Sequence, residues 1–238
     1  FGAKSPAAPW LWDDFEDGVV GNVIGGPWAT YNAYGGILPE YSLDRQRTPG
    51  SVVSKQGPLG NSTLEADNYP YGCNGGKMYI TGWFNGTDQG GSRSMKFLNL
   101  NSGSWNYPAI RTGGDCNWYR SEAFDANGNA VMSPDNVNGT PFTGQWERWD
   151  WVAHFGTDGL WLTYRDLELV AEASGNFGAE GCIESAYFSS YYGVGGTCPE
   201  DANGWWYWDE IYIDNTPARV ELGNASTWDA CTHREIQI

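Results

Sequence analysis

Short segments that alternate apolar and polar residues recur along this chain, and they constrain its fold more than any other feature. The clearest is QWERWDWVAHFG at 145–156, where Trp149, Trp151, Ala153 and Phe155 form one continuous apolar face. Successive side chains of a strand point to opposite faces of a sheet, so period two predicts a half-buried strand. Further strands are predicted at 10–18, 51–55, 77–84, 94–100, 182–192, 204–216 and 218–224.

The segment after 145–156 predicts a hairpin. Asp158-Gly159 is a turn dipeptide. The stretch 160–173 contains the Leu and Glu of a short helix, but the preceding turn favours two strands joined at Arg165–Asp166. The span 101–145 is interpreted as irregular, with DANGNAVMSPDNVNGTP as a polar loop.

Glycine is very common, with 33 residues in 238, and no segment has a convincing helical pattern. Strands spaced about 8–15 residues apart favour an all-β fold, a two-sheet antiparallel β-sandwich of the jelly-roll type. A chain of 238 residues suits one large β domain with a core that needs no metal or disulfide. We expect a linker or N-terminal arm at 1–9, the jelly roll at 10–223 and a C-terminal extension at 224–238.

The charge balance excludes several classes of partner. A formal net charge of −16 would repel nucleic acid and anionic membranes, and no apolar run approaches the ~18 residues of a membrane span. Acidic polysaccharides would need a local basic patch, and only 13 Lys and Arg are available. Neutral glycans, cationic partners and Ca²⁺ remain compatible with this charge.

Five cysteines occur without C-x-x-C spacing, which argues against a zinc knuckle. Cys182 and Cys198 bracket a Gly/Ser/Tyr loop and form one candidate disulfide; Cys73 and Cys116 form a second, leaving Cys231 over. We therefore expect an oxidising, extracellular or cell-surface location. Four Asn-x-Ser/Thr sequons are candidate surface-loop glycosylation sites if the source glycosylates secreted proteins: Asn61, Asn85, Asn138 and Asn224.

Two motifs near the ends of the chain carry a resemblance to a known group of domains. WDDFEDG at 12–18 and WDEIYIDNT at 208–216 resemble the paired terminal strands of concanavalin-A/laminin-G-like jelly rolls and related carbohydrate-binding modules. QWERWDWVAHFGTDGLW resembles their central hairpin. The resemblance implies a jelly-roll domain of a secreted bacterial protein, of the kind found in carbohydrate-binding modules and jelly-roll polysaccharide lyases.

The same comparison argues against catalysis. The Glu-x-Asp-x-x-Glu run of jelly-roll glucanases is absent, and so are the Gln-Ile-His and Tyr-Phe-Lys-x-Gly runs of jelly-roll alginate lyases. The resemblance therefore implies a binding protein more than an enzyme.

Aromatic residues on the second face of a strand are candidates for stacking on sugar rings, because a flat indole offers a large apolar area and a polar N–H. In 204–216 the alternation assigns Trp205, Tyr207, Ile211 and Ile213 to the core. The candidate platform residues are Trp83, Trp146, Trp206, Trp208 and Tyr212. A covering loop or a neighbouring subunit would equally explain an aromatic second face.

Arg148, Asp150 and His154 share one face of one predicted strand, at steps of about 6.6–7 Å per two residues. There they could bind sugar hydroxyls. A lyase would instead use His154, Tyr164 or Tyr192 as a base, with Arg148 neutralising a uronate. An ordinary ion pair on a solvated sheet is the third reading.

Acidic residues gather in the two terminal segments, which lie close together if those strands pair. Carboxylate oxygens in turns suit Ca²⁺, although no EF-hand spacing is present. The predicted ligands of a structural Ca²⁺ are Asp13, Asp14, Glu16, Asp209 and Asp214, unless these are solvated surface charges.

Taken together, the residues and the resemblance favour a secreted, non-catalytic carbohydrate-binding jelly-roll module with an aromatic platform and a structural calcium. Two alternatives stay open. One is a structural subunit of an extracellular filament or surface assembly, with the aromatic face as the interface between copies. The other is a polysaccharide lyase. The expected partners are a glycan and, for the assembly, further copies of the chain.

Overall fold

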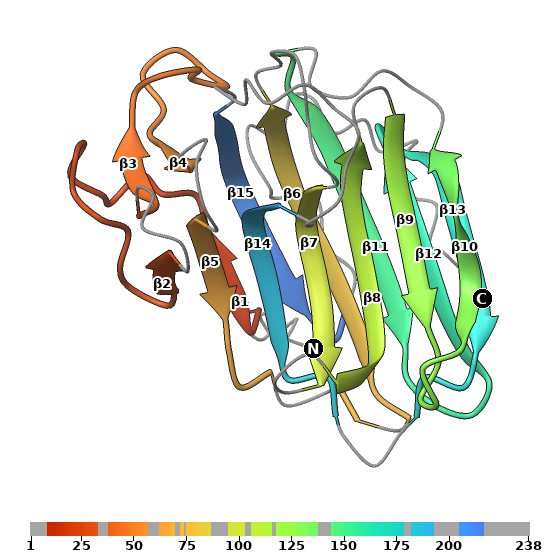
Figure 1. The fold of residues 1–238 in the computed structure, drawn as a ribbon. Coiled ribbons are helices and arrows are strands. Elements are labelled where there is room, and N and C mark those ends of the chain that lie inside the picture. Colours follow the sequence, from red (N-terminus) through yellow and green to blue (C-terminus); the bar gives the residue numbers. More distant parts are fainter. Residues whose placement is uncertain are drawn as a thin grey trace, which may run out of the picture.

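The computed structural model describes residues 9–32, 38–56, 62–69, 72–73, 75–86, 95–102, 106–115, 118–137, 144–178, 182–192 and 205–216. Within these residues the chain forms fifteen β-strands (Figure 1). Their bounds are β1 Leu11–Asp13, β2 Ala29–Asn32, β3 Glu40–Ser42, β4 Val53–Gln56, β5 Ser62–Ala66, β6 Lys77–Gly86, β7 Met95–Ser102, β8 Asn106–Asp115, β9 Trp118–Phe124, β10 Ala130–Val137, β11 Glu147–His154, β12 Gly159–Arg165, β13 Glu168–Gly175, β14 Ser185–Tyr192 and β15 Trp206–Asp214.

The strands form two antiparallel sheets that pack face to face (Figure 1). Sheet A has the order β13-β12-β11-β6-β15-β4-β3, with β1 also pairing with β15. Sheet B has the order β10-β9-β8-β7-β14-β5-β2. The predicted all-β jelly-roll sandwich is confirmed. The first and last described strands pair as the terminal motifs implied, with Leu11 opposite Ile213.

Most predicted strands are present, and one region was misread. The hairpin is confirmed, because β11 pairs with β12 and β12 pairs with β13 across a turn at Asp166–Leu167. Both turn residues have positive φ, as two-residue hairpin turns of this kind require. The segment 218–224 lies outside the described residues.

The span 101–145 contains β8, β9 and β10, so its interpretation as irregular was wrong. Within the described residues 125–137 of the polar stretch, the turn lies at the start, where Asp125 Oδ1 accepts hydrogen bonds from the amides of Asn127 and Asn129, both at 2.8 Å. Strand β8 pairs on both sides, with β7 and β9, and those hydrogen bonds outweigh a sequence of low β-propensity.

The core lies between the two sheets and is rich in indoles. Trp149 and Trp151 of β11 stack with ring centroids 5.9 Å apart. Trp208 of β15 meets Phe84 of the same sheet at 4.9 Å and Phe188 of sheet B at 5.0 Å. Contact across the sandwich therefore passes through large, fully buried aromatic rings.

Strand β15 does not follow the predicted alternation. Trp206, Trp208, Ile211 and Ile213 all belong to the buried core, so the assignment of Trp206 and Trp208 to the outer face was wrong. The cause is a β-bulge: the register with β6 shifts by one residue between Asp209 and Tyr212, and Glu210 has φ of 49°. One extra residue reverses the parity of the strand, so inward positions are even before the bulge and odd after it.

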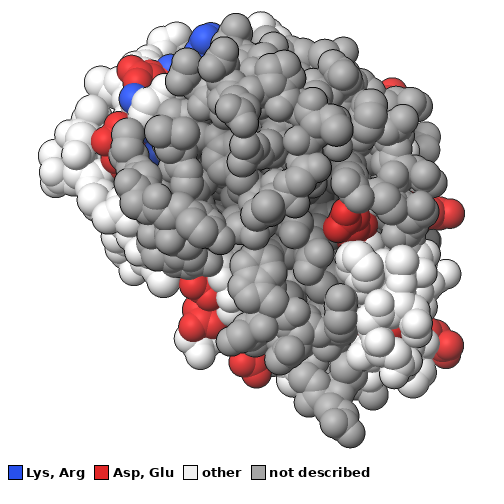
Figure 2. Space-filling model, viewed as in Figure 1, with Lys and Arg blue, Asp and Glu red and all other residues white. Residues whose placement is uncertain are grey.

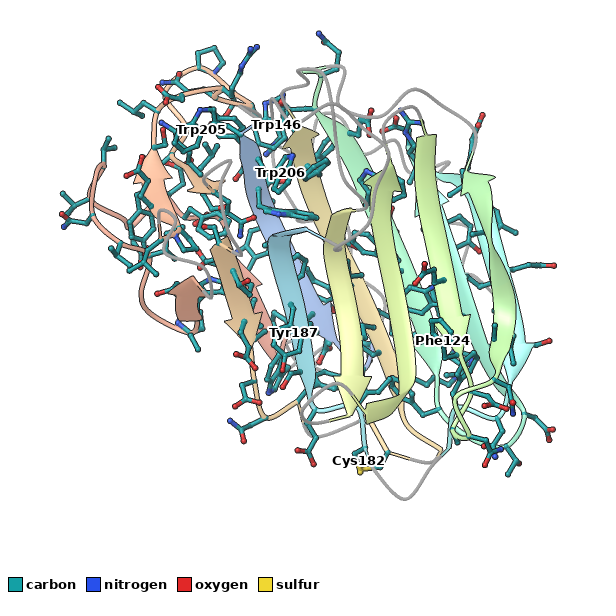
Figure 3. The ribbon with its side chains drawn as sticks, in the orientation of Figure 1. Phe124, Trp146, Cys182, Tyr187, Trp205 and Trp206 are labelled. Atoms are coloured by element: carbon teal, nitrogen blue, oxygen red, sulfur yellow. A yellow bond between two sulfur atoms is a disulfide. The ribbon has the colours of Figure 1, made fainter. Side chains whose placement is uncertain are left out.

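A disulfide joins Cys73 to Cys182, so both predicted pairings, Cys182–Cys198 and Cys73–Cys116, were wrong. The bond lies at one end of the sandwich (Figure 3). It connects the segment before β6 of sheet A with the segment before β14 of sheet B. Beside it, the Ile183 amide donates to the Gly72 carbonyl at 2.9 Å. Cys116, Cys198 and Cys231 lie outside the described residues.

The predicted arm at 1–9 and extension at 224–238 fall almost wholly outside the described residues, and the domain boundaries stay predictions. In the described part of the chain, no helix is long and apolar enough to cross a membrane.

Candidate functional site

Three central strands of sheet A present polar and aromatic side chains in register on the outer face of the sheet. Across β15, β6 and β11, Asp209 lies opposite Trp83, and Trp83 lies opposite Arg148. Two residues along β6 and β11, and three along the bulged β15, Tyr212, Thr81 and Asp150 form a second row. Adjacent strands are about 4.8 Å apart, so each row spans about 10 Å. We call the following set the outer patch: Arg47, Thr81, Trp83, Arg148, Asp150, Asp209, Glu210 and Tyr212.

The bulge in β15 explains why two adjacent carboxylates face the same way. Arg47, from the connection between β3 and β4, binds both: its Nε donates to Asp209 Oδ2 at 2.8 Å, and its Nη2 donates to Glu210 Oε1. The Arg47 guanidinium carbon also lies 5.1 Å from the ring centroid of Trp83. In a regular strand, Asp209 and Glu210 would point to opposite faces.

Burial perturbs both carboxyl groups. It raises the pKa of Asp209 to about 6 and the pKa of Glu210 to about 7, with the positive charge of Arg47 opposing the rise in each case. These groups therefore change charge close to neutral pH, far above the pH at which an ordinary carboxyl group ionises.

Arg148 and Asp150 meet as the shared strand face predicted. Arg148 Nη2 donates to Asp150 Oδ1 at 2.6 Å, and Thr81 Oγ1 donates to the same oxygen at 2.6 Å. Tyr164 continues this row on β12, opposite Asp150. Burial, Asp150 and Glu172 raise the pKa of Tyr164.

His154 lies on the same face but away from Arg148. Six positions along β11 separate them, or about 20 Å. The His154 ring stands nearly perpendicular to Tyr79, with centroids 6.3 Å apart. Burial and the nearby Lys77 lower the pKa of His154. Tyr192, the other predicted base, belongs to β14 of sheet B and does not share this face.

The buried polar atoms on the outer face of sheet A that have no hydrogen-bond partner in the structure include Trp83 Nε1, Asp150 Oδ2, His154 Nε2 and Glu210 Oε2. Similar atoms occur inside the sandwich, at Trp161 and Thr163 for example. Buried polar groups almost always have partners, so each exception needs an explanation. The outer ones lie on the face that the second sheet does not cover, but each atom is itself buried, so a ligand or water supplies the bond only after side chains move.

The remaining aromatic candidates lie near one end of the sandwich, where Trp146, Trp205 and Trp206 appear together (Figure 3). Trp146 is half-buried and its Nε1 donates to the Arg45 carbonyl at 3.0 Å. Trp205, assigned to the core from the sequence, is half-buried, with Lys55 Nζ 4.2 Å from its ring centroid. The Tyr212 hydroxyl donates to the Thr216 carbonyl at 2.9 Å.

Sequence reasoning missed Arg47, Thr81 and Trp205 as members of this face. Thr81 and Trp83 lie on the same face of the predicted strand 77–84, so the alternation in that segment could have identified Thr81. Arg47 lies 162 residues from Asp209 in a connection without periodicity, and no signal in the sequence places it there.

The predicted calcium ligands hold other partners. Asp13 accepts hydrogen bonds from Trp28 Nε1 and the Phe15 amide. Glu16 Oε1 accepts from the Val52 amide at 3.1 Å, and Asp14 Oδ1 from the Glu16 amide at 3.2 Å. No group of three or more His, Cys, Asp or Glu side chains that could hold a metal ion occurs in the described residues. A structural calcium stays a prediction.

Asn85 is not a surface-loop glycosylation site, and that prediction was wrong. Its side chain is 2% exposed within β6, and Nδ2 donates to the Gly144 carbonyl at 3.0 Å. The Asn-x-Ser/Thr motif alone does not predict the strand pairing that buries the Asn85 side chain. Asn61, Asn138 and Asn224 lie outside the described residues.

Basic side chains of the described residues gather near β3 and β4, while acidic ones are spread around the margin of the visible face (Figure 2). The basic groups near β3 and β4 are matched by acids: Lys55 Nζ lies 2.6 Å from Asp44 and 3.6 Å from Glu40. Within the described residues, no stretch of this edge therefore carries a large positive excess.

No protein-family model matches the chain, and no curated protein matches its sequence significantly. Several solved structures share its fold. An endo-β-1,4-glucuronan lyase from the fungus Trichoderma reesei is 14% identical, with a TM-score of 0.66 over 88% of this chain and 96% of that one.

A cellulose-induced protein, Cip1, is 18% identical, with a TM-score of 0.58 over 87% of this chain and 98% of that one. Alginate lyase Aly36B is 12% identical, with a TM-score of 0.58 over 86% and 96%. At these identities the likeness shows the fold. The chain is a concanavalin-like jelly roll that resembles those of polysaccharide lyases, as its terminal motifs implied.

Proposed function

We propose that the outer face of sheet A binds a polysaccharide, which makes this protein a carbohydrate-binding jelly roll. One observation carries the proposal: buried polar atoms of Trp83, Asp150 and Glu210 have unused hydrogen-bonding capacity beside aromatic rings on the face of sheet A that sheet B does not cover. Sugar hydroxyls both donate and accept hydrogen bonds, and the C–H faces of sugar rings pack on aromatic side chains. A polysaccharide therefore supplies both kinds of contact that this face offers.

A row of side chains across five strands of sheet A gives the ligand a path. Trp12, Tyr212, Thr81, Asp150 and Tyr164 lie opposite one another on β1, β15, β6, β11 and β12. Four strand spacings make the row about 19 Å long, enough for several sugar units. Aromatic residues occupy both ends and polar residues the middle, and Trp12 is 37% exposed.

The similar structures support this function without establishing it. Two of them are lyases whose names give polysaccharide substrates, glucuronan and alginate, and a third is a cellulose-induced protein. The Cys73–Cys182 disulfide is compatible with the extracellular location that such a ligand requires. Self-assembly of this chain stays a prediction.

Affinity electrophoresis in gels that contain one polysaccharide each tests the proposal. We expect retardation by at least one glycan, and we expect Trp12→Ala to weaken that binding about tenfold, since a stacking ring is lost. Tyr187→Ala is the matched control, because Tyr187 lies on β14 of sheet B (Figure 3). Retardation by no glycan, or equal losses in both variants, would contradict the proposal.

A polysaccharide lyase is the second candidate, favoured by the His154–Tyr79 pair at the far end of the same face. Burial holds the pKa of His154 below its ordinary value, so its imidazole is uncharged at neutral pH and able to accept a proton. A lyase base removes the proton beside a uronate carboxyl, and the neighbouring C–O bond breaks to leave a C=C bond.

Ultraviolet absorbance of that C=C bond distinguishes the two candidates. Rising absorbance with glucuronan or alginate, abolished by His154→Ala, would establish the lyase. Binding without any rise in absorbance would leave the protein a binding module.

A further inference from the structure

We infer that the outer patch accepts an uncharged sugar unit and rejects a uronate. The inference rests on the proposed binding function and names the class of polysaccharide that the face would take.

The charges of the patch favour a neutral ligand. Three carboxyl groups, those of Asp150, Asp209 and Glu210, lie with two guanidinium groups, those of Arg47 and Arg148, so the fully ionised set sums to −1. Each guanidinium already binds carboxylates of the patch: Arg47 holds Asp209 and Glu210, and Arg148 holds Asp150. A uronate would bring a further negative charge to carboxylates that it could approach only by displacing these pairs.

The unused hydrogen-bonding atoms point the same way. Among the buried atoms of the patch without a hydrogen-bond partner in the structure, Asp150 Oδ2 and Glu210 Oε2 need donors when ionised, and Trp83 Nε1 needs an acceptor. A hydroxymethyl or ring hydroxyl donates to a carboxylate and accepts from an indole N–H. A sugar carboxylate only accepts, so it could not donate to either oxygen in place of the hydroxymethyl group.

Burial makes this discrimination strong. The Glu210 side chain is 7% exposed and the Asp209 side chain 2%, so solvent and salt screen their charges weakly. Like charges brought together at an interface in such surroundings repel each other strongly, and this repulsion excludes wrong partners.

A matched pair of ligands tests the inference: β-1,4-linked glucose oligomers and β-1,4-linked glucuronic acid oligomers of equal length. They differ only in a hydroxymethyl or a carboxylate group at C6. Before that comparison, a gel panel of neutral polysaccharides (a soluble cellulose derivative, xylan, mannan, starch) and acidic ones (glucuronan, alginate, polygalacturonate) identifies what the chain binds. All measurements are made at pH 8 and low salt, where the carboxylates are ionised.

We expect retention by a neutral glycan, and at least tenfold weaker binding of the uronate form of the same backbone. Glu210→Gln should reduce that preference to less than threefold, since it removes one negative charge but keeps an acceptor oxygen. Asp150→Asn provides the same test if the first variant does not fold. Asp158→Asn is the control, because it removes an exposed carboxylate in the turn between β11 and β12 and should leave the preference unchanged.

Equal or tighter binding of an acidic glycan would overturn the inference and leave the proposed binding function standing. A preference for neutral glycans that Glu210→Gln and Asp150→Asn leave intact would also overturn it, because the patch would not be its source. If no neutral or acidic glycan is retained, the proposed function fails, and the inference fails with it.

Discussion

At the scale of single residues, Arg47 joins groups that the sequence holds far apart. It binds Asp209 and Glu210 and lies over the Trp83 ring. Removing one partner of a buried ion pair leaves a charge without compensation, which commonly costs 3–5 kcal/mol. Here the uncompensated groups would be two carboxylates, and their protonation state sets the cost.

The stability of an Arg47→Ala variant should therefore depend on pH. In the folded protein the pKa values of Asp209 and Glu210, about 6 and about 7, lie above the ordinary values of 3.8 and 4.5 for these carboxyl groups. The folded state thus binds more protons between about pH 4 and 7, and stability falls as pH rises through that window. Without Arg47 both pKa values rise further.

We expect Arg47→Ala to lose about 3–5 kcal/mol of unfolding free energy at pH 8 and clearly less at pH 5, where both carboxyl groups are protonated. Urea denaturation at the two pH values measures this. Arg45→Ala removes an exposed charge from the same connection and serves as the control. An equal loss at both pH values would show that the carboxylates are not what Arg47 compensates.

At the scale of secondary-structure elements, β15 decides which side chains face outward. Most strands were predictable, because the alternation in 77–84 and 145–156 is a local property that pairing preserves. The bulge at Glu210 was not predictable from the sequence. It changes no residue type, and it only changes which residues of β15 face the core. Strands β8, β9 and β10 were missed for a related reason: their pairing partners stabilise segments with little pattern of their own.

Alanine variants at two neighbouring tryptophans test the parity of β15. Trp208 is fully buried between the sheets, so Trp208→Ala should lower the unfolding free energy by about 3–5 kcal/mol through the cavity it leaves. Trp205→Ala removes a half-buried ring over Lys55 and should cost about 1 kcal/mol. Denaturant titration of both variants measures the difference, and the reverse order of losses would contradict the bulge.

At the scale of the whole molecule, the Cys73–Cys182 bond ties the two sheets together at one end. It closes a loop with a sequence separation of 109 residues, beside a close contact between two backbones. A Cβ at Gly72 would lie 1.5 Å from the Ile183 carbonyl oxygen, so only glycine fits there. The disulfide and this contact hold the starts of β6 and β14 in fixed positions.

Loss of the disulfide should destabilise the sandwich by about 2–5 kcal/mol, chiefly because the unfolded chain gains freedom. Cys73→Ser and Cys182→Ser should each show this loss, and the double variant should lose no more than either single one. Thermal or urea unfolding measures the effect, and mass spectrometry of nonreduced peptides identifies the pair. A peptide that links Cys182 to Cys198 would contradict the assignment.

Local periodicity and glycine content were enough to predict most of the strands and the all-β class, and the resemblance of the two terminal motifs implied the terminal pairing. These depend on neighbours along the chain and on composition, which any single sequence displays. The bulge, the disulfide partner and the position of Arg47 depend on which distant segments meet. Such contacts join residues more than a hundred positions apart, and their energies arise only when both sheets are packed. Arg47 and the shared orientation of Asp209 and Glu210 are products of those contacts, and for that reason only the tertiary structure revealed these parts of the outer patch.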